Sequence, residues 1–359
     1  MLRHGVTPVV ARALDGMVIP TVGRQAKRRI AMAAQAIVFR NRHLVSELMR
    51  VTALFEANGV ATLAFKGPTL GAIAYGDIAL RAFTDLDILV HRKDFERAAD
   101  LLIADRYGPA GSSARRVGSA ISTAFGSAFE AQRGQDFIDL HSQIRRRRFH
   151  CFPDEESLWD RSIVLELEGR RVRTFAPADL LLYLCAHGAK HGWTSLKMIA
   201  DVARIIERCE IDLDEVMRDA ERIGSDRMVL LGLMLANELL GASVAPAILE
   251  RGLADVAVKG AKMTVVDAMF REEQIEAEAE NYRGIAVRLM NPADRARYWW
   301  WRAVTPTAGD WEFIWLPRRA YPAYFLVRPV RLALQFVRSR VRRKARPDLS
   351  RPVADELEI

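Results

Sequence analysis

The sequence predicts an α+β fold, in which a small mixed β-sheet flanked by helices is followed by an α-helical C-terminal domain. Two observations predict it. Short apolar runs bounded by turn residues, the pattern of strands, lie before residue 176. From Pro177 onward, apolar residues recur with helical spacing instead. Half of the 359 residues are hydrophobic, so the chain can bury a sizeable core.

The first half alternates helices and strands. Helical periodicity over 24–58 ends at Gly59, a residue type that favours helix C-termini. The strands expected after it cover 60–65, 85–90, 123–131 and 136–141, with a hairpin turn at Arg133-Gly134. The helices expected between and after them cover 68–75, 92–106 and 155–160. A second hairpin, 163–175, turns at Glu168-Gly169.

The second half is expected to be helical throughout. Its predicted helices cover 177–191, 195–209, 212–223, 226–240, 246–257, 261–280 and 292–304. The chain therefore divides into an N-terminal helical segment (1–58), an α+β domain (59–176), an α-helical domain (177–320) and a basic amphipathic helix with its tail (321–359).

Composition points to a cytoplasmic protein with a polyanionic partner. The three cysteines are widely spaced and lack CxxC pairing, as expected for reduced thiols. No signal peptide and no apolar run of membrane-spanning length are apparent. The formal net charge is +8, and no acidic residue lies between Glu312 and Asp348, an interval with ten Lys or Arg. A nucleotide, an RNA or an anionic membrane surface would suit this charge.

Two aspartates stand in the strand-like stretch DLDILV. Residues two apart in a strand share a face, so Asp85 and Asp87 are expected to project together while Leu86, Ile88 and Val90 face the core. The stretch DFIDLH offers Asp139, with His141 on the same face. Three such carboxylates can hold one or two Mg²⁺ or Mn²⁺ ions. The structural alternative for Asp85 and Asp87 is a strand-start cap and a solvent-facing acid. For Asp139 it is an exposed strand residue or a structural partner of an arginine.

A turn upstream complements these acids. Lys66-Gly67-Pro68 ends one apolar run and begins a helix, and such a helix start attracts an anion. Thr69 adds a hydroxyl and Arg81 a second cation, so both are candidate nucleotide contacts. An acidic metal cluster facing a phosphate site is what phosphoryl transfer requires. An ordinary strand-end role remains open for Lys66 and a structural role for Arg81.

This arrangement resembles the polymerase-β-like nucleotidyltransferase superfamily. The stretches FKGPTLGAIAYGDIALRAFTDLDILV, DLH and PADLLLYLCAHGAKHGWTSLKMIADVARII are similar to a bacterial family called uncharacterised nucleotidyltransferases. The resemblance covers roughly residues 45–210 and, weakly, the helical remainder. Pro68 stands where superfamily members usually have Gly or Ser, and the gap from Gly67 to Asp85 is long.

The resemblance implies transfer of an NMP from an NTP such as ATP. It implies metal ligation and catalysis by Asp85, Asp87 and Asp139, and nucleotide contacts from Lys66, Gly67, Thr69 and Arg81. The acceptor could be a small molecule, a peptide or an RNA. Two rival hypotheses are a non-catalytic nucleotide-binding adaptor and an RNA-directed, toxin-like transferase.

The remaining candidates are histidines and arginines. His187 and His191 are four apart and would share a helix face, either as structural residues or, with His141, on the acceptor side. Because Gly188 replaces the glutamate of a zinc-protease motif, we expect no zinc site. The run Arg145–Arg148 is either a solvated surface or an anion contact.

The tail is expected to form a basic amphipathic helix that starts at Pro329. Its apolar stripe consists of Val330, Leu334, Val337 and Val341, opposite Arg331, Arg338, Arg342 and Arg346. The helix could pack on the protein itself, lie on anionic lipid or bind RNA.

Overall fold

The computed structural model describes residues 4–15, 17, 22–110, 128–144, 150–270 and 284–344. Contacts divide the chain into two compact units, Met1–Tyr298 and Trp299–Ile359. The first unit contains the α+β part and the helices that follow it as far as residue 298. The four-part division at residues 58, 176 and 320 stays a prediction.

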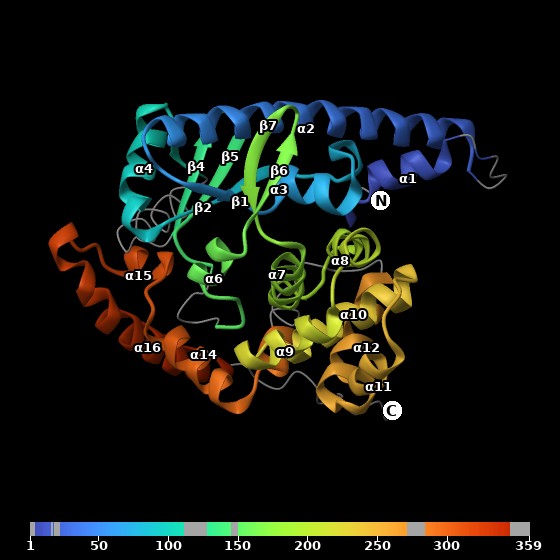
Figure 1. Ribbon diagram of the computed structural model, residues 1–359. Helices are drawn as coiled ribbons and strands as arrows, with labels where there is room; N and C mark the ends of the chain where they lie inside the picture. Colours follow the sequence, from blue (N-terminus) through green and yellow to red (C-terminus); the bar gives the residue numbers. More distant parts are fainter. Residues whose placement is uncertain are drawn as a thin grey trace, which may run out of the picture. The chain divides into compact units, whose positions relative to one another are not determined.

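The elements follow one another as a helical N-terminus, an α+β part and a run of helices (Figure 1). The strands are β1 (Thr62–Ala64), β2 (Asp85–Val90), β3 (Gly108–Pro109), β4 (Ala128–Arg133), β5 (Asp136–His141), β6 (Ile163–Leu167) and β7 (Arg170–Thr174). The helices and helical turns of the first half are α1 (Thr7–Leu14), α2 (Arg24–Ala57), α3 (Gly67–Leu70), η2 (Gly71–Tyr75), η3 (Ile78–Leu80), η4 (Arg92–Asp94), α4 (Phe95–Ala104) and α6 (Glu155–Asp160). Those of the second half are α7 (Pro177–Lys190), α8 (Leu196–Arg208), α9 (Leu213–Ile223), α10 (Asp226–Leu240), α11 (Pro246–Ala254), α12 (Val256–Phe270), α14 (Pro292–Val304), α15 (Ala308–Phe313), η5 (Arg318–Ala323) and α16 (Tyr324–Lys344).

The main sheet is mixed, as predicted. Its strand order is β1-β2-β5-β4-β3, and β2 and β5 run parallel while the other neighbours are antiparallel. Strands β6 and β7 form a separate hairpin. That hairpin turns at Glu168 and Gly169, which both have positive φ, the geometry of a type I′ turn.

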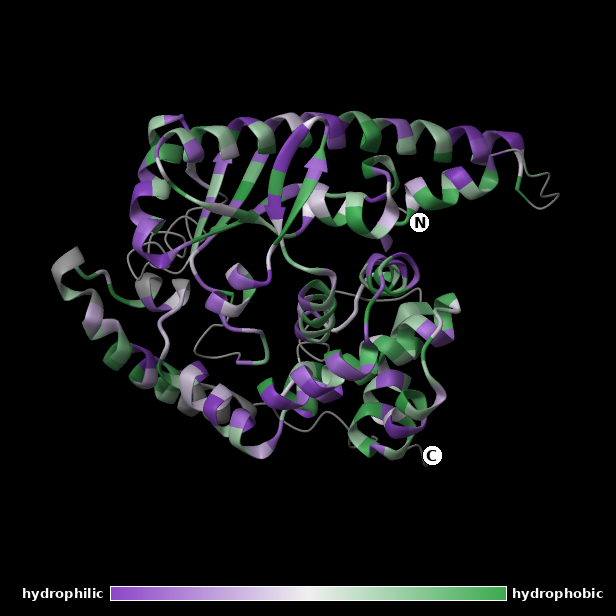
Figure 2. Ribbon diagram, in the orientation of Figure 1, coloured by the Kyte–Doolittle hydropathy of each residue, from purple (hydrophilic) through white to green (hydrophobic). Residues whose placement is uncertain are grey.

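The two faces of the sheet belong to different cores. Leu86, Ile88 and Val90 of β2 pack with side chains of α2 and α4, as the alternation predicted. Leu89, between them, points to the opposite face and packs with the core of α7–α12. Figure 2 shows α2 with alternating hydrophilic and hydrophobic turns, as expected for a helix that covers one sheet face and meets solvent on its other side. Asp85 and Asp87 share the Leu89 face, so the sheet presents its acids toward the helical half.

Most predicted elements are confirmed, with shifts at their ends. The predicted helices 246–257 and 261–280 divide elsewhere, because Asp255 ends α11 and its side chain caps α12 by accepting the Ala257 and Val258 N–H groups. The part of that prediction beyond Phe270, and the strand predicted over 123–127, lie outside the described residues. Sequence patterns missed α1 and the two-residue strand β3.

The predicted start of the tail helix is wrong. Helix α16 begins at Tyr324, and Pro329 lies inside it. The Tyr324 hydroxyl donates to the Ile314 carbonyl and accepts the Leu316 N–H, which anchors the earlier start. Pro329 lies in the second turn of α16, where its missing N–H removes one hydrogen bond of the helix. Across the described residues, no helix is both long and apolar enough to span a membrane.

Candidate functional site

The acidic face of the sheet brings two aspartates into register. Asp87 of β2 pairs with Asp139 of β5 across the parallel ladder. Neighbouring strands lie about 4.8 Å apart, so the two carboxylates stand side by side. Burial, and then the negative charges of Asp87 and Asp85, raise the pKa of Asp139 to about 7. The pairing of these two aspartates follows from the β2–β5 register, which sequence alone did not give.

Lys66 partly neutralises this pair. Its ammonium lies 2.8 Å from Asp87 Oδ1. Burial acts to raise the pKa of Asp87, but the Lys66 charge and His141 outweigh it and hold that pKa below its ordinary value. The second oxygen, Asp87 Oδ2, is buried and has no hydrogen-bond partner among the described residues. A buried carboxylate oxygen without a partner is costly, and a bound cation would satisfy it.

His141 completes a group that can hold a metal ion. Its Nε2 lies 3.4 Å from Asp87 Oδ1. One ligand atom from each of Asp87, Asp139 and His141 lies within 4.8 Å of the others. Two carboxylates, one of them with an orphaned oxygen, and one nitrogen donor fit a divalent cation. Asp85 shares their strand face, but it is not part of this group.

The turn between β1 and α3 has the tight geometry that the sequence indicated. Gly67 has φ +53°, and a Cβ there would lie 3.0 Å from the Asp85 carbonyl oxygen. Only glycine meets both requirements without strain. Thr69 is fully buried, and its hydroxyl donates to the Ala64 and Lys66 carbonyls. Thr69 therefore closes the turn and does not point into the site.

A small polar cavity adjoins the acidic group. Its volume is about 180 Å³, and it shares Lys66 with the carboxylates. The residues that line it are Lys66, Gly67, Arg81, Thr84, Asp85, Leu184, His187, Lys197, Met198 and Asp201. Three of these side chains are cationic and two are acidic, and Asp201 is already paired with Arg81. The lining therefore keeps a net positive charge, which suits an anion.

Arg81, which lines the cavity, also forms a buried ion pair with Asp201. Its Nε and Nη2 donate to the two oxygens of Asp201 at 2.8 and 2.9 Å. The Tyr75 hydroxyl donates to the same carboxylate at 2.9 Å. Both members of the pair are at most 5% exposed, so this contact fastens the segment after α3 to helix α8. Arg81 thus has a structural partner in addition to the predicted role.

Lys197 is a cavity cation that sequence reasoning missed. It is the second residue of α8, and its Nζ donates to the Ala82 carbonyl at 3.2 Å. The positive charge of Arg81, and then burial, lower the pKa of Lys197 to about 8. A lysine in the first turn of a helix opposes the helix dipole. That unfavourable placement is the signal in the sequence that could have identified it.

The two predicted histidines do share a face at the end of α7. The rings of His187 and His191 lie 4.4 Å apart between centroids. His187 lines the cavity, and burial, then the nearby Lys66 charge, hold its pKa well below the ordinary value. It is therefore a neutral imidazole. His191 is exposed at the helix end.

Gly188 has a packing role. A Cβ at this position would lie 2.6 Å from the Trp193 ring, which is buried against α7 and α10. The absence of a glutamate between the two histidines therefore has a steric reason, and the pair does not form the zinc-protease arrangement.

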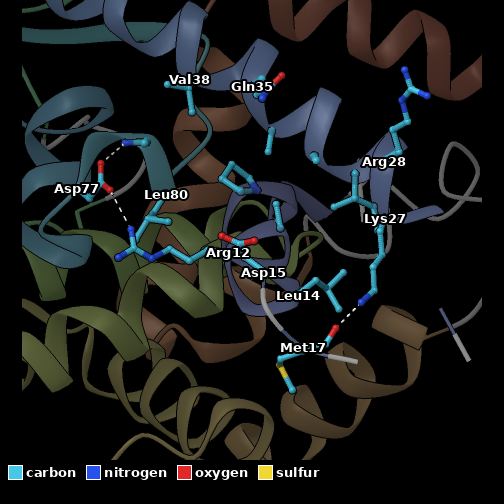
Figure 3. A pocket seen from close by; sticks show the side chains of 16 residues that line it. Arg12, Leu14, Asp15, Met17, Lys27, Arg28, Gln35, Val38, Asp77 and Leu80 are labelled. Carbon is cyan, nitrogen blue, oxygen red and sulfur yellow. Dashed lines mark hydrogen bonds and ion pairs between the residues drawn. The ribbon is translucent and has the colours of Figure 1, made fainter. Parts of the chain in front are cut away.

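A larger cleft lies among α1, α2 and η3, away from these groups. Its volume is about 1010 Å³. Figure 3 shows Arg12 and Asp77 paired across it and the Lys27 ammonium reaching the Met17 carbonyl. None of the ten site residues predicted from sequence lines this cleft.

Two clusters of basic residues were predicted, Arg145–Arg148 and the arginines of the tail helix. The run Arg145–Arg148, like Arg346, lies outside the described residues. In the second unit, Arg331 was expected opposite the apolar stripe. Its Nε donates to Asp310 Oδ1 at 2.6 Å, and its side chain is mostly buried. Arg328 contacts the same aspartate. Val330 and Leu334, the first residues of the predicted stripe, are exposed.

Comparison with known proteins identifies the family. The sequence profile of the uncharacterised nucleotidyltransferase family matches residues 1–241. The chain belongs to this family. Among solved structures, an antigenic nucleotidyltransferase-like protein from Paracoccidioides brasiliensis is similar, with TM-score 0.33 and 16% identity over 59% of this chain and 97% of that one. No curated protein matches the chain.

Proposed function

We propose that this protein is a nucleotidyltransferase, which moves an NMP from an NTP to a hydroxyl or phosphate oxygen of an acceptor and releases pyrophosphate. One observation carries the proposal: Asp87 and Asp139 stand in register, with an orphaned Asp87 oxygen, beside a cation-lined cavity. A divalent ion, Mg²⁺ or Mn²⁺, when bound there would supply positive charge next to the reacting phosphate.

The cavity would hold phosphate oxygens of the NTP. Lys66 and Lys197 offer ammonium groups, and Arg81 offers the guanidinium nitrogen not used by Asp201. Such fixed donors stabilise charge as it develops on the leaving pyrophosphate. Because Gly67 has no side chain, its backbone can approach the phosphates closely.

The transfer itself needs one proton movement. An acceptor oxygen forms a bond to the α-phosphorus while the bond from that phosphorus to the bridging oxygen breaks, and the electron pair leaves with pyrophosphate. When the acceptor is a hydroxyl, its proton passes to a carboxylate oxygen of Asp139. Asp85, on the same strand face as Asp87, lines the cavity.

The acceptor would enter from the side of α7. His141, His187 and His191 extend from the acidic group to the exposed end of that helix. Between them, the Tyr183 ring stacks beside His187 at 5.4 Å between centroids. These aromatic rings suit the organic part of an acceptor.

Calorimetric titration with non-hydrolysable NTP analogues tests the nucleotide site. We expect binding that needs Mg²⁺ or Mn²⁺ and is lost in Asp87→Asn. The exposed aspartate of α4, in Asp100→Asn, is a matched control that should leave binding intact. Wild-type protein that is folded yet binds none of the four analogues would refute the site.

The adaptor hypothesis has one observation in its favour. Lys66 already neutralises Asp87, as it would in a site that binds nucleotide without catalysis. An adaptor would bind the analogues as described but transfer no NMP to any acceptor.

The RNA-directed hypothesis was based on Arg145–Arg148 and the tail. Salt-dependent RNA binding is its test.

We also propose that the second unit touches an anionic surface. Leu326, Val330 and Trp315 are exposed on it, within a stretch that carries no acidic residue after Glu312. Exposed aromatic and aliphatic side chains beside arginines are typical of interfacial binding. Cosedimentation with phosphatidylserine vesicles should fall in Trp315→Ser, and equal binding to neutral phosphatidylcholine vesicles would contradict the proposal.

A further inference from the structure

The third member of the candidate metal group is a nitrogen donor, His141. Sequence reasoning grouped Asp85 with Asp87 and Asp139, whereas the atoms that lie within 4.8 Å of one another belong to Asp87, Asp139 and His141. His141 follows Asp139 by two residues on β5, so strand geometry holds both on one face. The Phe65 ring lies 5.6 Å from the imidazole between centroids and limits how far it can turn.

The state of Asp87 points to a ligand at this position. Asp87 is 3% exposed, and Lys66 approaches only its Oδ1. Its Oδ2 is buried without a hydrogen-bond partner among the described residues. An ammonium on one oxygen leaves the other available to a second cation. This unpartnered oxygen is an observation independent of the grouping itself.

We propose that His141 is the third protein ligand of the divalent ion, and that the site therefore prefers a divalent transition ion to Mg²⁺. The proposal rests on the proposed function, because it concerns the metal of that site. Mg²⁺ favours oxygen ligands in near-ideal octahedral geometry and gives up water reluctantly. Imidazole is a common ligand of transition ions. Replacing a third carboxylate with neutral imidazole also lowers the negative charge by one unit, which weakens the attraction for Mg²⁺.

Pulsed electron paramagnetic resonance of Mn²⁺ bound to the full-length protein tests this ligand directly. The experiment uses Mn²⁺ alone, without nucleotide, so that no base nitrogen is present. We expect a nitrogen coupling that changes when the protein is labelled with ¹⁵N-histidine. The coupling should vanish in His141→Asn and persist in His187→Asn, a matched control for the other histidine near the site.

Metal titrations complete the test. In wild type, we expect the Kd for Mn²⁺ to be at least about tenfold lower than that for Mg²⁺. In His141→Asp, which restores three carboxylates, this preference should shrink or reverse. Mn²⁺ could bind in a way that depends on Asp87 and yet show no histidine nitrogen coupling. That result would overturn the assignment of His141 as a ligand while leaving the proposed function intact. Failure of Mn²⁺ and Mg²⁺ to bind, with or without an NTP analogue, would overturn both.

Discussion

Lys197 provides the sharpest prediction about phosphate recognition. The residue lines the cavity and carries a pKa of about 8, lowered first by Arg81. A hydrogen bond to a charged group contributes about 1.5–3 kcal/mol, so Lys197→Met should weaken anion binding by roughly 10- to 150-fold. The probe is inorganic pyrophosphate, titrated calorimetrically at low salt.

The pH dependence of pyrophosphate binding shows whether the charge of Lys197 is what matters. A lowered lysine pKa means that the side chain is protonated below pH 8 and neutral above it. Raising the pH from about 7 to about 9 takes the protonated fraction of Lys197 from about 0.9 to about 0.1. In Lys197→Arg the guanidinium stays charged over this range. Because pyrophosphate also loses protons over this range, the two proteins are compared at each pH, and wild-type affinity should fall about tenfold relative to that of Lys197→Arg.

Two results would refute this reasoning. One is a Lys197→Arg variant with the same pH dependence as wild type. The other is a folded Lys197→Met variant that binds pyrophosphate as tightly as wild type. Circular dichroism and the thermal midpoint establish that each variant is folded, since Lys197 also holds the Ala82 carbonyl.

Three further predictions concern stability and geometry. Arg81→Met leaves Asp201 buried with an uncompensated charge and should cost about 3–5 kcal/mol in denaturant unfolding; a loss below about 1 kcal/mol would contradict the pair's structural role. Gly188→Ala places a methyl group against Trp193 and should lower the free energy of unfolding by about 1–3 kcal/mol. The thermal midpoint should fall and the tryptophan emission should shift. Unchanged values would mean that the Trp193 ring moves freely. Gly67→Ala places a side chain at a positive φ and in close contact with the Asp85 carbonyl. It should destabilise the fold by about 1 kcal/mol or more and weaken NTP-analogue binding. Binding at wild-type strength would show that the turn is not part of the phosphate site.

Sequence patterns predicted the parts of the site that depend on local geometry. The alternation in DLDILV correctly placed Asp85 and Asp87 on the face opposite Leu86, Ile88 and Val90. The Lys-Gly-Pro stretch correctly indicated a turn into a helix that ends near Tyr75. Both follow from spacing within a few residues, which strand and helix periodicity dictate.

The contacts between distant segments were not predictable in the same way. The proximity of His141 to Asp87 depends on the register of two strands whose residues are more than fifty positions apart. The partner of Arg81 is Asp201, on a helix of the second half, and a buried arginine looks like a surface arginine in sequence. Thr69 was assigned a nucleotide contact because a hydroxyl after a glycine turn fits that role, whereas its hydroxyl is turned toward backbone carbonyls.

The most direct test of the proposed activity follows the label of an NTP. The protein is incubated with Mg²⁺ or Mn²⁺, a fractionated acceptor pool and ATP, GTP, CTP or UTP labelled at the α- or the γ-phosphate. Nucleotidyl transfer predicts an acceptor that gains α-label but never γ-label, with pyrophosphate released in equal amount and no product in Asp87→Asn. Transfer of γ-label, or α-label transfer that survives in Asp87→Asn, would contradict the proposed mechanism.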